Sequence, residues 1–385
     1  MMKEITDLIY VSCILPVERE KEMIQASPNS VSIQAYKYHR LLAEGFARNG
    51  VNVTVLTYQK YLSSIGIHDG NTDRINNVEY NYIVPSISGK LSYADLFLKI
   101  YNAVKILCKK KTNVAVICDI LNLTIAYAAC VAAKHIGIQV VGIVTDFPNM
   151  SKKSFNSKMM WRLISKCDKW VLLTEQMYEY LGKKKPAVIM EGHADENMAV
   201  LSNLIENKDN PRRCIYAGGL KKIHGIEKLV KAFQESGVDN AELHVYGNGE
   251  YASELQNLND PRIIYHGVVP NGEVVSRELT ATLLINPRPS TEEFTKYSFP
   301  SKNMEYMASG TAVLTTKLPG MPKEYYEYVY LFEDESIEGM AKTIKEVLSL
   351  TSQELFSKGK KAREYVLTEK SNVRQASRII ELMQQ

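Results

Sequence analysis

The chain has 385 residues, of which 45% are hydrophobic and 23% charged. This length predicts two or three domains, and the composition is that of an ordinary globular enzyme. The six cysteines form no C-x-x-C pair, which argues against a disulfide framework and against a zinc site.

The net charge of +4 is spread unevenly, because the excess of lysine and arginine lies in residues 1–200. That distribution is compatible with an anionic partner. The N-terminal residues do not resemble a signal peptide, and no apolar stretch approaches the ~20 residues that a membrane span needs. We therefore expect a cytoplasmic protein, with peripheral contact to the inner face of the membrane as a further hypothesis.

The first half alternates β-branched apolar runs with segments of helical periodicity. Strands are expected at 7–15, 51–58, 78–85, 113–120, 139–147, 169–177 and 187–192, and helices at 32–50, 94–111 and 124–137. Apolar strands that alternate with helices predict a parallel sheet covered on both faces.

A second alternating series begins at Cys214, after a polar stretch. Strands are expected at 214–219, 242–249, 263–269, 281–289 and 311–317, and helices at 226–237, 250–258, 300–309 and from Ser336 onward. The predicted fold class is α/β, with two Rossmann-like doubly wound domains. Their boundaries are 1–200 and 214–365, joined by a linker at 201–213 and followed by a C-terminal helix at 366–385 that packs back toward the first domain.

The segment "YSFPSKNMEYMASG", residues 297–310, holds the clearest site signal. Pro300 suits the first position of a helix, and Gly310 suits a left-handed end. The free N–H groups at such a start attract anions, and Ser301 and Lys302 lie in its first turn. Glu305 shares a helix face with Lys302 and is suited to accept hydrogen bonds from sugar hydroxyls. Phosphate beside hydroxyls indicates a nucleotide.

Ligands of open α/β sheets bind at the carboxyl ends of the strands, so the loops there are candidates. Arg288, between two prolines, can hold a diphosphate with paired hydrogen bonds. In "AGGLKKIHG", Gly218 and Gly219 allow backbone N–H groups to approach a phosphate, with Lys222 just beyond; a plain strand-to-helix turn is an equal alternative. "YGNG" is no dinucleotide fingerprint, but Gly247 and Asn248 could lie against a base or ribose.

These residues resemble the GT-B glycosyltransferases of the large retaining family four, and the match is specific in "EYMASGTAVLTT". The resemblance implies a nucleotide-sugar donor on the second domain and an acceptor on the first, with Glu305 binding the ribose. The form "FPSK..EYMASG" resembles a subgroup associated with bacterial surface polysaccharide assembly. Two departures stand out. Tyr297 replaces the first acid of the family signature, and Gly219 and His224 occupy the positions of its usual cationic pair, so Arg288 and Lys302 are expected to supply the charge.

In the first half, the resemblance points to Asp146, at the carboxyl end of the strand 139–147, as a catalytic residue near the transferred sugar. Asp119, Asn29, Ser30 and His193 are candidates for binding the acceptor. The catalytic set is therefore Asp146, Arg288 and Lys302. The resemblance further implies that the departing phosphate takes the acceptor proton, with no metal and no cofactor.

The implied activity is transfer of a sugar from a nucleotide sugar, with a UDP-sugar as the expected donor, to a glycan or polyprenyl-linked acceptor with retention of configuration. Residues 151–170 combine lysines with Phe155, Trp161 and methionines, a pattern typical of a helix in an anionic membrane surface or of one packed on the sheet. A nucleotide-sugar epimerase of the same architecture and a non-catalytic nucleotide-sugar-binding subunit stay open as alternatives. No nucleic-acid-binding module is recognisable.

Overall fold

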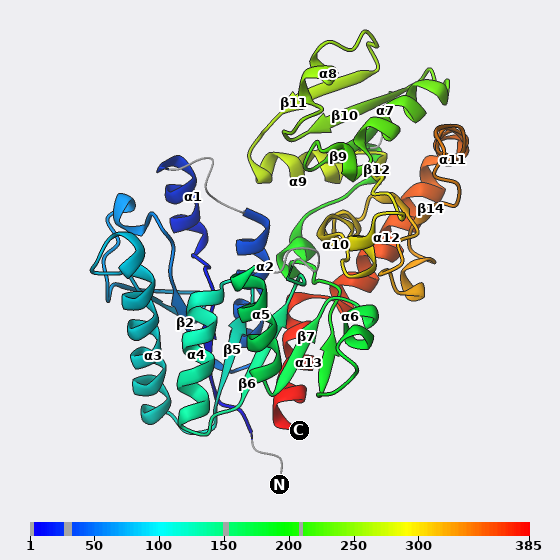
Figure 1. The fold of residues 1–385 in the computed structure, drawn as a ribbon. Coiled ribbons are helices and arrows are strands. Elements are labelled where there is room, and N and C mark those ends of the chain that lie inside the picture. The colour runs from blue at the N-terminus through cyan, green and yellow to red at the C-terminus, as the bar shows by residue number, and fades with distance from the viewer. Residues whose placement is uncertain (1–3, 27–32, 149–153, 208–210) are drawn as a thin grey trace. The chain divides into compact units, whose positions relative to one another are not determined.

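The computed structural model describes residues 4–26, 33–148, 154–207 and 211–385. They form two compact α/β units. In Figure 1 the N-terminal unit runs from blue to green and also includes the red helix α13, and the C-terminal unit runs from green to orange. The N-terminal unit comprises Met1–Met190 and Asn372–Gln385, and the C-terminal unit is Glu191–Ser371. The division therefore falls at Met190, whereas the sequence placed it at residue 200.

The N-terminal unit is built on one sheet with the strand order β3-β4-β2-β1-β5-β6-β7-β8. All neighbouring strands in it pair in parallel except β3 and β4, which are antiparallel. The central strand β5 is buried along its whole length, as expected for a sheet covered on both faces. The strands are β1 (Asp7–Val11), β2 (Asn52–Thr57), β3 (Thr72–Ile75), β4 (Val78–Tyr82), β5 (Val114–Asp119), β6 (Val140–Val144), β7 (Lys169–Leu172) and β8 (Ala187–Ile189).

Helices cover both faces of this sheet, and three of them, α3, α4 and α5, pack side by side (Figure 1). The helices are α1 (Val17–Ala26), α2 (Ile33–Arg48), α3 (Ser92–Lys110), α4 (Leu123–His135), α5 (Phe155–Lys166), α6 (Glu175–Tyr180) and α13 (Asn372–Gln384), with 3-10 turns η1 (Leu62–Ile65) and η2 (Gly89–Leu91).

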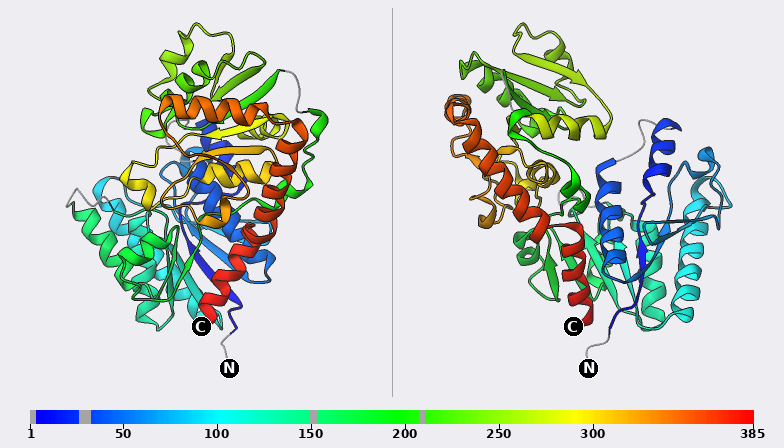
Figure 2. Two further views of the ribbon diagram at one scale, coloured as in Figure 1. Left: turned by 90° about the vertical axis from the view of Figure 1, so that its right-hand side faces the viewer. Right: turned by 180° about the vertical axis from the view of Figure 1, so that it is seen from behind.

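The last helix of the chain, α13, packs on α2 and so belongs to the N-terminal unit (Figure 2). The two helices approach so closely at Gly45 that a β-carbon there would lie 2.4 Å from the carbonyl oxygen of Asn372. The side chain of Asn372 also donates a 2.8 Å hydrogen bond to the carbonyl oxygen of Leu41. Glycine in the middle of α2 is therefore explained by this contact.

The C-terminal unit is built on a parallel sheet with the order β11-β10-β9-β12-β13-β14. In chain order this is 3-2-1-4-5-6, the arrangement of a Rossmann domain. The predicted class, α/β with two Rossmann-like doubly wound units, is confirmed. The strands are β9 (Arg212–Ala217), β10 (Ala241–Tyr246), β11 (Ile263–Gly267), β12 (Leu283–Asn286), β13 (Ala312–Thr316) and β14 (Tyr330–Phe332).

The helices of this unit lie on the two faces of its sheet and at its ends. They are α7 (Ile226–Glu235), α8 (Ala252–Gln256), α9 (Asn271–Thr280), α10 (Ser301–Ser309), α11 (Ile337–Ser349) and α12 (Ser352–Glu369), with 3-10 turns η3 (Glu196–Val200), η4 (Ile205–Asn207), η5 (Lys222–His224), η6 (Glu293–Lys296) and η7 (Lys323–Tyr325). Helices α1, α6 and α9 and strands β3 and β14 were not expected from the sequence. Helix α9 buries only Val274 and Glu278, so its sequence has little apolar periodicity.

The described residues of the expected linker, 201–213, pack on the C-terminal unit. Asn203 donates a 2.6 Å hydrogen bond to the carbonyl oxygen of Ser309, and the guanidinium of Arg363 donates to the carbonyl oxygens of Met198 and Leu201, at 2.6 Å each. Hydrogen bonds between side chains and backbone carbonyls therefore hold this polar segment on the C-terminal unit.

The chain passes between the units twice, at Met190 and at Ser371, and the adjoining C-terminal-unit segments are paired. Ala194 donates its N–H to the carbonyl oxygen of Lys370 at 2.8 Å. The buried ammonium of Lys370 lies 3.4 Å from the carboxylate of Glu191 and 2.7 Å from that of Glu324. The ion pair between Lys370 and Glu191 joins the end of the C-terminal unit to its start.

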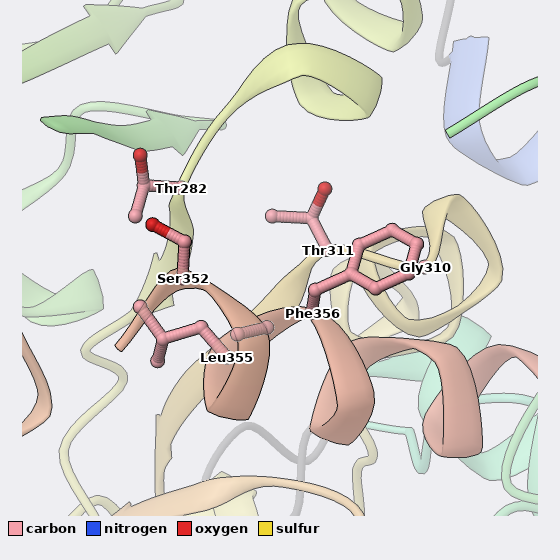
Figure 3. Close-up of a pocket in the computed structure, with 7 residues that line it drawn as sticks. Thr282, Gly310, Thr311, Ser352, Leu355 and Phe356 are labelled. Carbon is pink, nitrogen blue, oxygen red and sulfur yellow. The ribbon is translucent and has the colours of Figure 1, made fainter. Parts of the chain in front are cut away.

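Each unit has its own apolar core. Figure 3 shows a cavity of about 10 Å³ in the C-terminal unit, between α12 and the start of β13, lined by Leu355, Phe356 and Thr311 among others. It has room for about one water molecule and is a packing gap. No helix in the described part of the chain is long and apolar enough to cross a membrane.

Candidate functional site

The strand order of the C-terminal sheet reverses between β9 and β12, which marks the usual ligand position of such a sheet. The loop after β9 contains Gly218 and Gly219, and the loop after β12 contains Arg288. A β-carbon on Gly225 would lie 2.0 Å from the carbonyl oxygen of Pro287, so the two loops touch. Gly218, Gly219 and Arg288 therefore lie at the same edge of the sheet, as the sequence predicted.

Helix α10 begins beside these loops and has the ends expected from the sequence. Pro300 is its N-cap, with no side chain capping the first N–H groups, and Gly310 ends it with φ +80°. A buried amide network joins the helix to the sheet, because Asn286 donates a 2.7 Å hydrogen bond to Asn303, and Asn303 donates to Thr315 at 3.3 Å. The sequence did not point to these two asparagines, although Asn303 is next to Lys302 and Asn286 is two residues before Arg288.

Arg288 is the cation that this site leaves uncompensated. Its guanidinium is half-buried, stacks over Phe294 at 5.5 Å from the ring centroid, and has no carboxylate within 4 Å among the described residues. Burial lowers the pKa of Arg288, a change that the nearby Tyr216 only partly opposes. Burying a cation without a counter-charge costs stability, so an anionic ligand is the natural partner.

Lys302 lies in the first turn of α10, as expected, but its charge is balanced within the helix. Its ammonium is 3.0 Å from the carboxylate of Glu305, and the two side chains are 19% and 14% exposed. Burial opposes the charge of Lys302, yet Glu305 and Glu278 outweigh this effect and raise its pKa. Of the two cations expected to supply the charge, Lys302 is paired with Glu305, whereas Arg288 has no carboxylate within 4 Å among the described residues.

The residues just before α10 face the same helix end. Ser301 is exposed at its first position, and Tyr297, which replaces an acid of the family signature, is half-buried. The hydroxyl of Ser298 is shielded from water and has no hydrogen-bond partner among the described residues. A shielded hydroxyl of this kind is available to a ligand.

The loop after β9 is held by its own side chains. The hydroxyl of Tyr216 donates a 2.9 Å hydrogen bond to the carbonyl oxygen of Gly219, and His224 Nδ1 lies 3.1 Å from the same oxygen. Burial and the positive charge of Arg288 lower the pKa of His224, although the Gly219 carbonyl opposes them. Lys222 is exposed and lies within 4 Å of Glu227 and Glu254, so its predicted role at the donor is weakened.

The glycines of "YGNG" serve contact between backbones. Gly247 has φ +126°, and a β-carbon there would lie 1.9 Å from the carbonyl oxygen of Gly218. Leu220 donates its N–H to the carbonyl oxygen of Asn248 at 2.9 Å, while the Asn248 side chain is exposed. Packing against the loop after β9 thus accounts for glycine at position 247, and contact of this turn with a base or ribose stays a prediction.

Gly247→Ala is expected to destabilise the C-terminal unit by about 3 kcal/mol, since it combines backbone strain with a clash against a carbonyl group. Gly267→Ala is the matched control: its φ is also positive, at +70°, but nothing lies within 4 Å of the added carbon. The control should lose only about 1 kcal/mol. Thermal unfolding followed by circular dichroism would measure both, and equal losses would contradict the close contact.

The N-terminal candidates differ in how far they are buried. Asp119 is buried at the end of β5, where it accepts hydrogen bonds from the Ser12 hydroxyl at 2.9 Å and the Leu121 N–H at 3.1 Å. Nε2 of His39 lies 3.1 Å from the same carboxylate, and the hydroxyl of Tyr10 is 2.6 Å from Nδ1 of His39. Asp119 is therefore engaged in a buried network, which corrects its assignment as a direct contact of the acceptor.

Asp146 is exposed after β6, and partial desolvation raises the pKa of its carboxyl group even though the Phe147 N–H opposes the shift. His193 is buried in the C-terminal unit. Asn29 and Ser30 lie outside the described residues. Asp146 is thus the one acidic candidate of this unit that is open to a ligand within the described part of the chain.

The helix expected at the membrane surface is α5, and its aromatic side is largely packed. Trp161 lies 5.2 Å from Phe147 and 5.9 Å from Tyr180 between ring centroids, and Leu163 and Ile164 are buried. Phe155, at its start, is exposed. Lys152 and Lys153 lie outside the described residues. The packed alternative therefore describes most of α5.

Two Rossmann-like units with these strand orders define the GT-B fold. Several solved structures resemble the chain over almost its whole length. Sucrose-phosphate synthase from Thermosynechococcus elongatus aligns with a TM-score of 0.70 at 14% identity, covering 98% of both chains. HepE from Anabaena, solved with UDP, gives 0.66 at 12% identity, covering 98% of this chain and 99% of that one. The lipopolysaccharide outer core galactosyltransferase WaaB gives 0.62 at 13% identity with the same coverage.

Residues 211–350 match the family model described as Glycosyl transferases group 1. The matched segment contains Arg288, Lys302 and Glu305, so the family's sequence pattern covers the candidate site. A comparison with curated protein sequences found no match. Among the described residues, no group of three or more His, Cys, Asp or Glu side chains is arranged to hold a metal ion.

Proposed function

We propose that this protein is a glycosyltransferase that binds the diphosphate of a nucleotide sugar at Arg288 and the start of α10. The supporting observation is the half-buried guanidinium of Arg288, which has no carboxylate within 4 Å in the described part of the chain. The family match over the same residues supplies the reaction class. HepE, which shares the fold, was solved with UDP and with UDP-glucose, which supports a uridine nucleotide as donor.

In this proposal each element of the site has a separate task. Arg288 and the free N–H groups of α10 stabilise the negative charge that develops on the leaving diphosphate. Glu305, oriented by Lys302, accepts hydrogen bonds from the ribose. The acceptor is a glycan or a lipid-linked glycan bound by the N-terminal unit, with Asp146 near the transferred sugar. The product retains the anomeric configuration and enters cell-surface polysaccharide.

The first test is binding of UDP and UDP-glucose to the whole chain by isothermal titration calorimetry, with inorganic pyrophosphate and GDP as comparisons. We expect UDP to bind and to raise the melting temperature, because a ligand held by the native state alone stabilises that state. Failure of every nucleotide sugar to bind would contradict the proposal.

A second measurement separates transfer from its alternatives. Incubation with the donor that binds and with a lipid-linked glycan extract should release UDP and lengthen the glycan. Isomerisation of the donor sugar without an acceptor would indicate an epimerase. Tight donor binding with no release under any acceptor would indicate a non-catalytic subunit, an outcome that Tyr297 in place of the family's first acid makes worth testing.

A further inference from the structure

The N-terminal unit has a large groove of about 790 Å³, of the size that takes a small ligand. It lies at the carboxyl ends of β1, β2 and β5, where the strand order of this sheet reverses between β1 and β5. The starts of α3, α4 and α5, side by side in Figure 1, complete its walls. Its position is therefore that of a ligand site.

None of the described residues that line the groove is charged. Five of its residues are aromatic, and the aliphatic ones come from α3, from the segment between β5 and α4, and from the first turn of α4. The lining residues are Cys13, Tyr58, Tyr93, Leu96, Phe97, Leu121, Asn122, Leu123, Thr124, Ile125, Tyr127, Phe155, Asn156 and Met159. Such a wall suits an apolar chain.

Apolar side chains are also exposed at the mouth of the groove. Phe155 is 75% exposed and Tyr93 is 62% exposed, although both line it. Leu121 is exposed at the groove, and Leu91 is exposed two residues before Tyr93. An exposed apolar patch of this kind marks a surface that contacts a lipid or another partner. A soluble glycan would give no reason to expose leucines.

Uncompensated lysines accompany this apolar surface. Lys60, Lys90 and Lys158 are exposed, lie within three residues of the lining residues Tyr58, Tyr93 and Met159, and have no carboxylate partner in the described ranges. The nearby acid Asp95 accepts a 2.6 Å hydrogen bond from the Ser86 N–H and lies 3.9 Å from Lys99. The surroundings of the groove therefore favour an anion.

We propose that this groove binds the hydrocarbon chain of a polyisoprenyl phosphate or diphosphate, with its phosphates on the flanking lysines. Calling this lipid the carrier of the acceptor rests on the proposed function, whereas binding of the lipid does not. The groove would hold the carrier chain next to the sheet end where Asp146 is exposed. The membrane contact expected of α5 as a whole is thereby confined to its first turn.

The test uses farnesyl phosphate, below the concentration at which it aggregates, titrated into the whole chain without any sugar donor. We expect saturable binding with one site per chain. Tyr93→Ser and Phe155→Ser should each weaken it at least fivefold, and both side chains are exposed enough for the variants to fold. Leu98→Ser is the matched control, because Leu98 is 58% exposed on the same helix as Tyr93 but does not line the groove.

The contribution of the lysine charges is tested with a double variant and with farnesol, which lacks the phosphate. The double variant Lys90→Ala, Lys158→Ala should weaken the binding of farnesyl phosphate at least fivefold and leave the binding of farnesol unchanged. Absence of farnesyl phosphate binding, equal weakening by Leu98→Ser, or binding of a lipid-free oligosaccharide in the groove would each overturn the proposal. Because no donor is present, such a failure would leave UDP binding at Arg288 intact, and failure of UDP binding would leave the lipid result intact.

Discussion

Replacing Arg288 with alanine is expected to lower the rate of sugar transfer by about 10²- to 10³-fold, the usual effect of removing one preorganised group that stabilises developing charge. The guanidinium stands half-buried after β12 with no carboxylate within 4 Å in the described residues. Its contribution should grow as the glycosidic bond breaks and the diphosphate gains charge. Steady-state rates with saturating donor would measure the effect on turnover.

The same substitution should not cost stability, which distinguishes a binding cation from a structural one. Burial lowers the pKa of Arg288, so the folded protein holds this charge at a cost. We expect Arg288→Ala to keep or raise the melting temperature. Arg288→Lys should recover part of the rate, because it keeps the charge but loses the paired geometry.

Arg277→Ala is the matched control. Arg277 is an exposed arginine on α9 that lies 3.7 Å from Glu273. The substitution Arg277→Ala should leave both the rate of sugar transfer and the melting temperature unchanged. Wild-type transfer by Arg288→Ala, or a loss of stability as large as that of a core substitution, would show that Arg288 does not bind the donor.

The second large effect is expected at Asp119, as a loss of stability of about 3–5 kcal/mol in Asp119→Ala. Removal of this buried carboxylate leaves His39 and the hydroxyl of Ser12 without their shared partner. Burial by itself raises the pKa of Asp119, but His39, Ser12 and the Leu121 N–H outweigh it and lower the pKa overall. The wild type should therefore lose this contribution as the pH falls through the lowered pKa, and keep it fully above about 3.9, the ordinary pKa of aspartate.

Tryptophan fluorescence during urea unfolding would measure this effect selectively. Both tryptophans of the sequence, Trp161 and Trp170, belong to the N-terminal unit. Asp146→Ala is the control, because this aspartate follows the neighbouring strand but is exposed, and it should change stability by less than about 0.5 kcal/mol. A similar midpoint for both variants would refute the structural role of Asp119.

The sequence predicted the features that local chemistry determines. The start of α10 directly after Pro300 and its end directly before Gly310 follow from the backbone properties of those two residues. The approach of the Arg288 loop to the loop after β9 follows from the parallel sheet order. Strand β14 and helix α9 were missed because one has three residues and the other buries few apolar side chains.

Features that depend on tertiary contacts were beyond the sequence. Gly247 resembles a ligand-binding glycine until the carbonyl group of Gly218 is seen beside it. Asp119 resembles an open carboxylate until His39, from a distant helix, is placed against it. Lys302 and Glu305 were assigned to one helix face correctly, but the 3.0 Å separation that balances their charges required the side-chain positions.

The packing of α13 on α2 has a consequence for how the protein is made. Residues 372–385 complete the N-terminal unit, yet they are translated after all of Glu191–Ser371. The N-terminal unit therefore cannot be completed until residues 372–385 have been synthesised, and until then the face of α2 that contacts α13 stays uncovered. Of the two units, only the segment 191–371 is continuous enough to be produced by itself as a recombinant fragment.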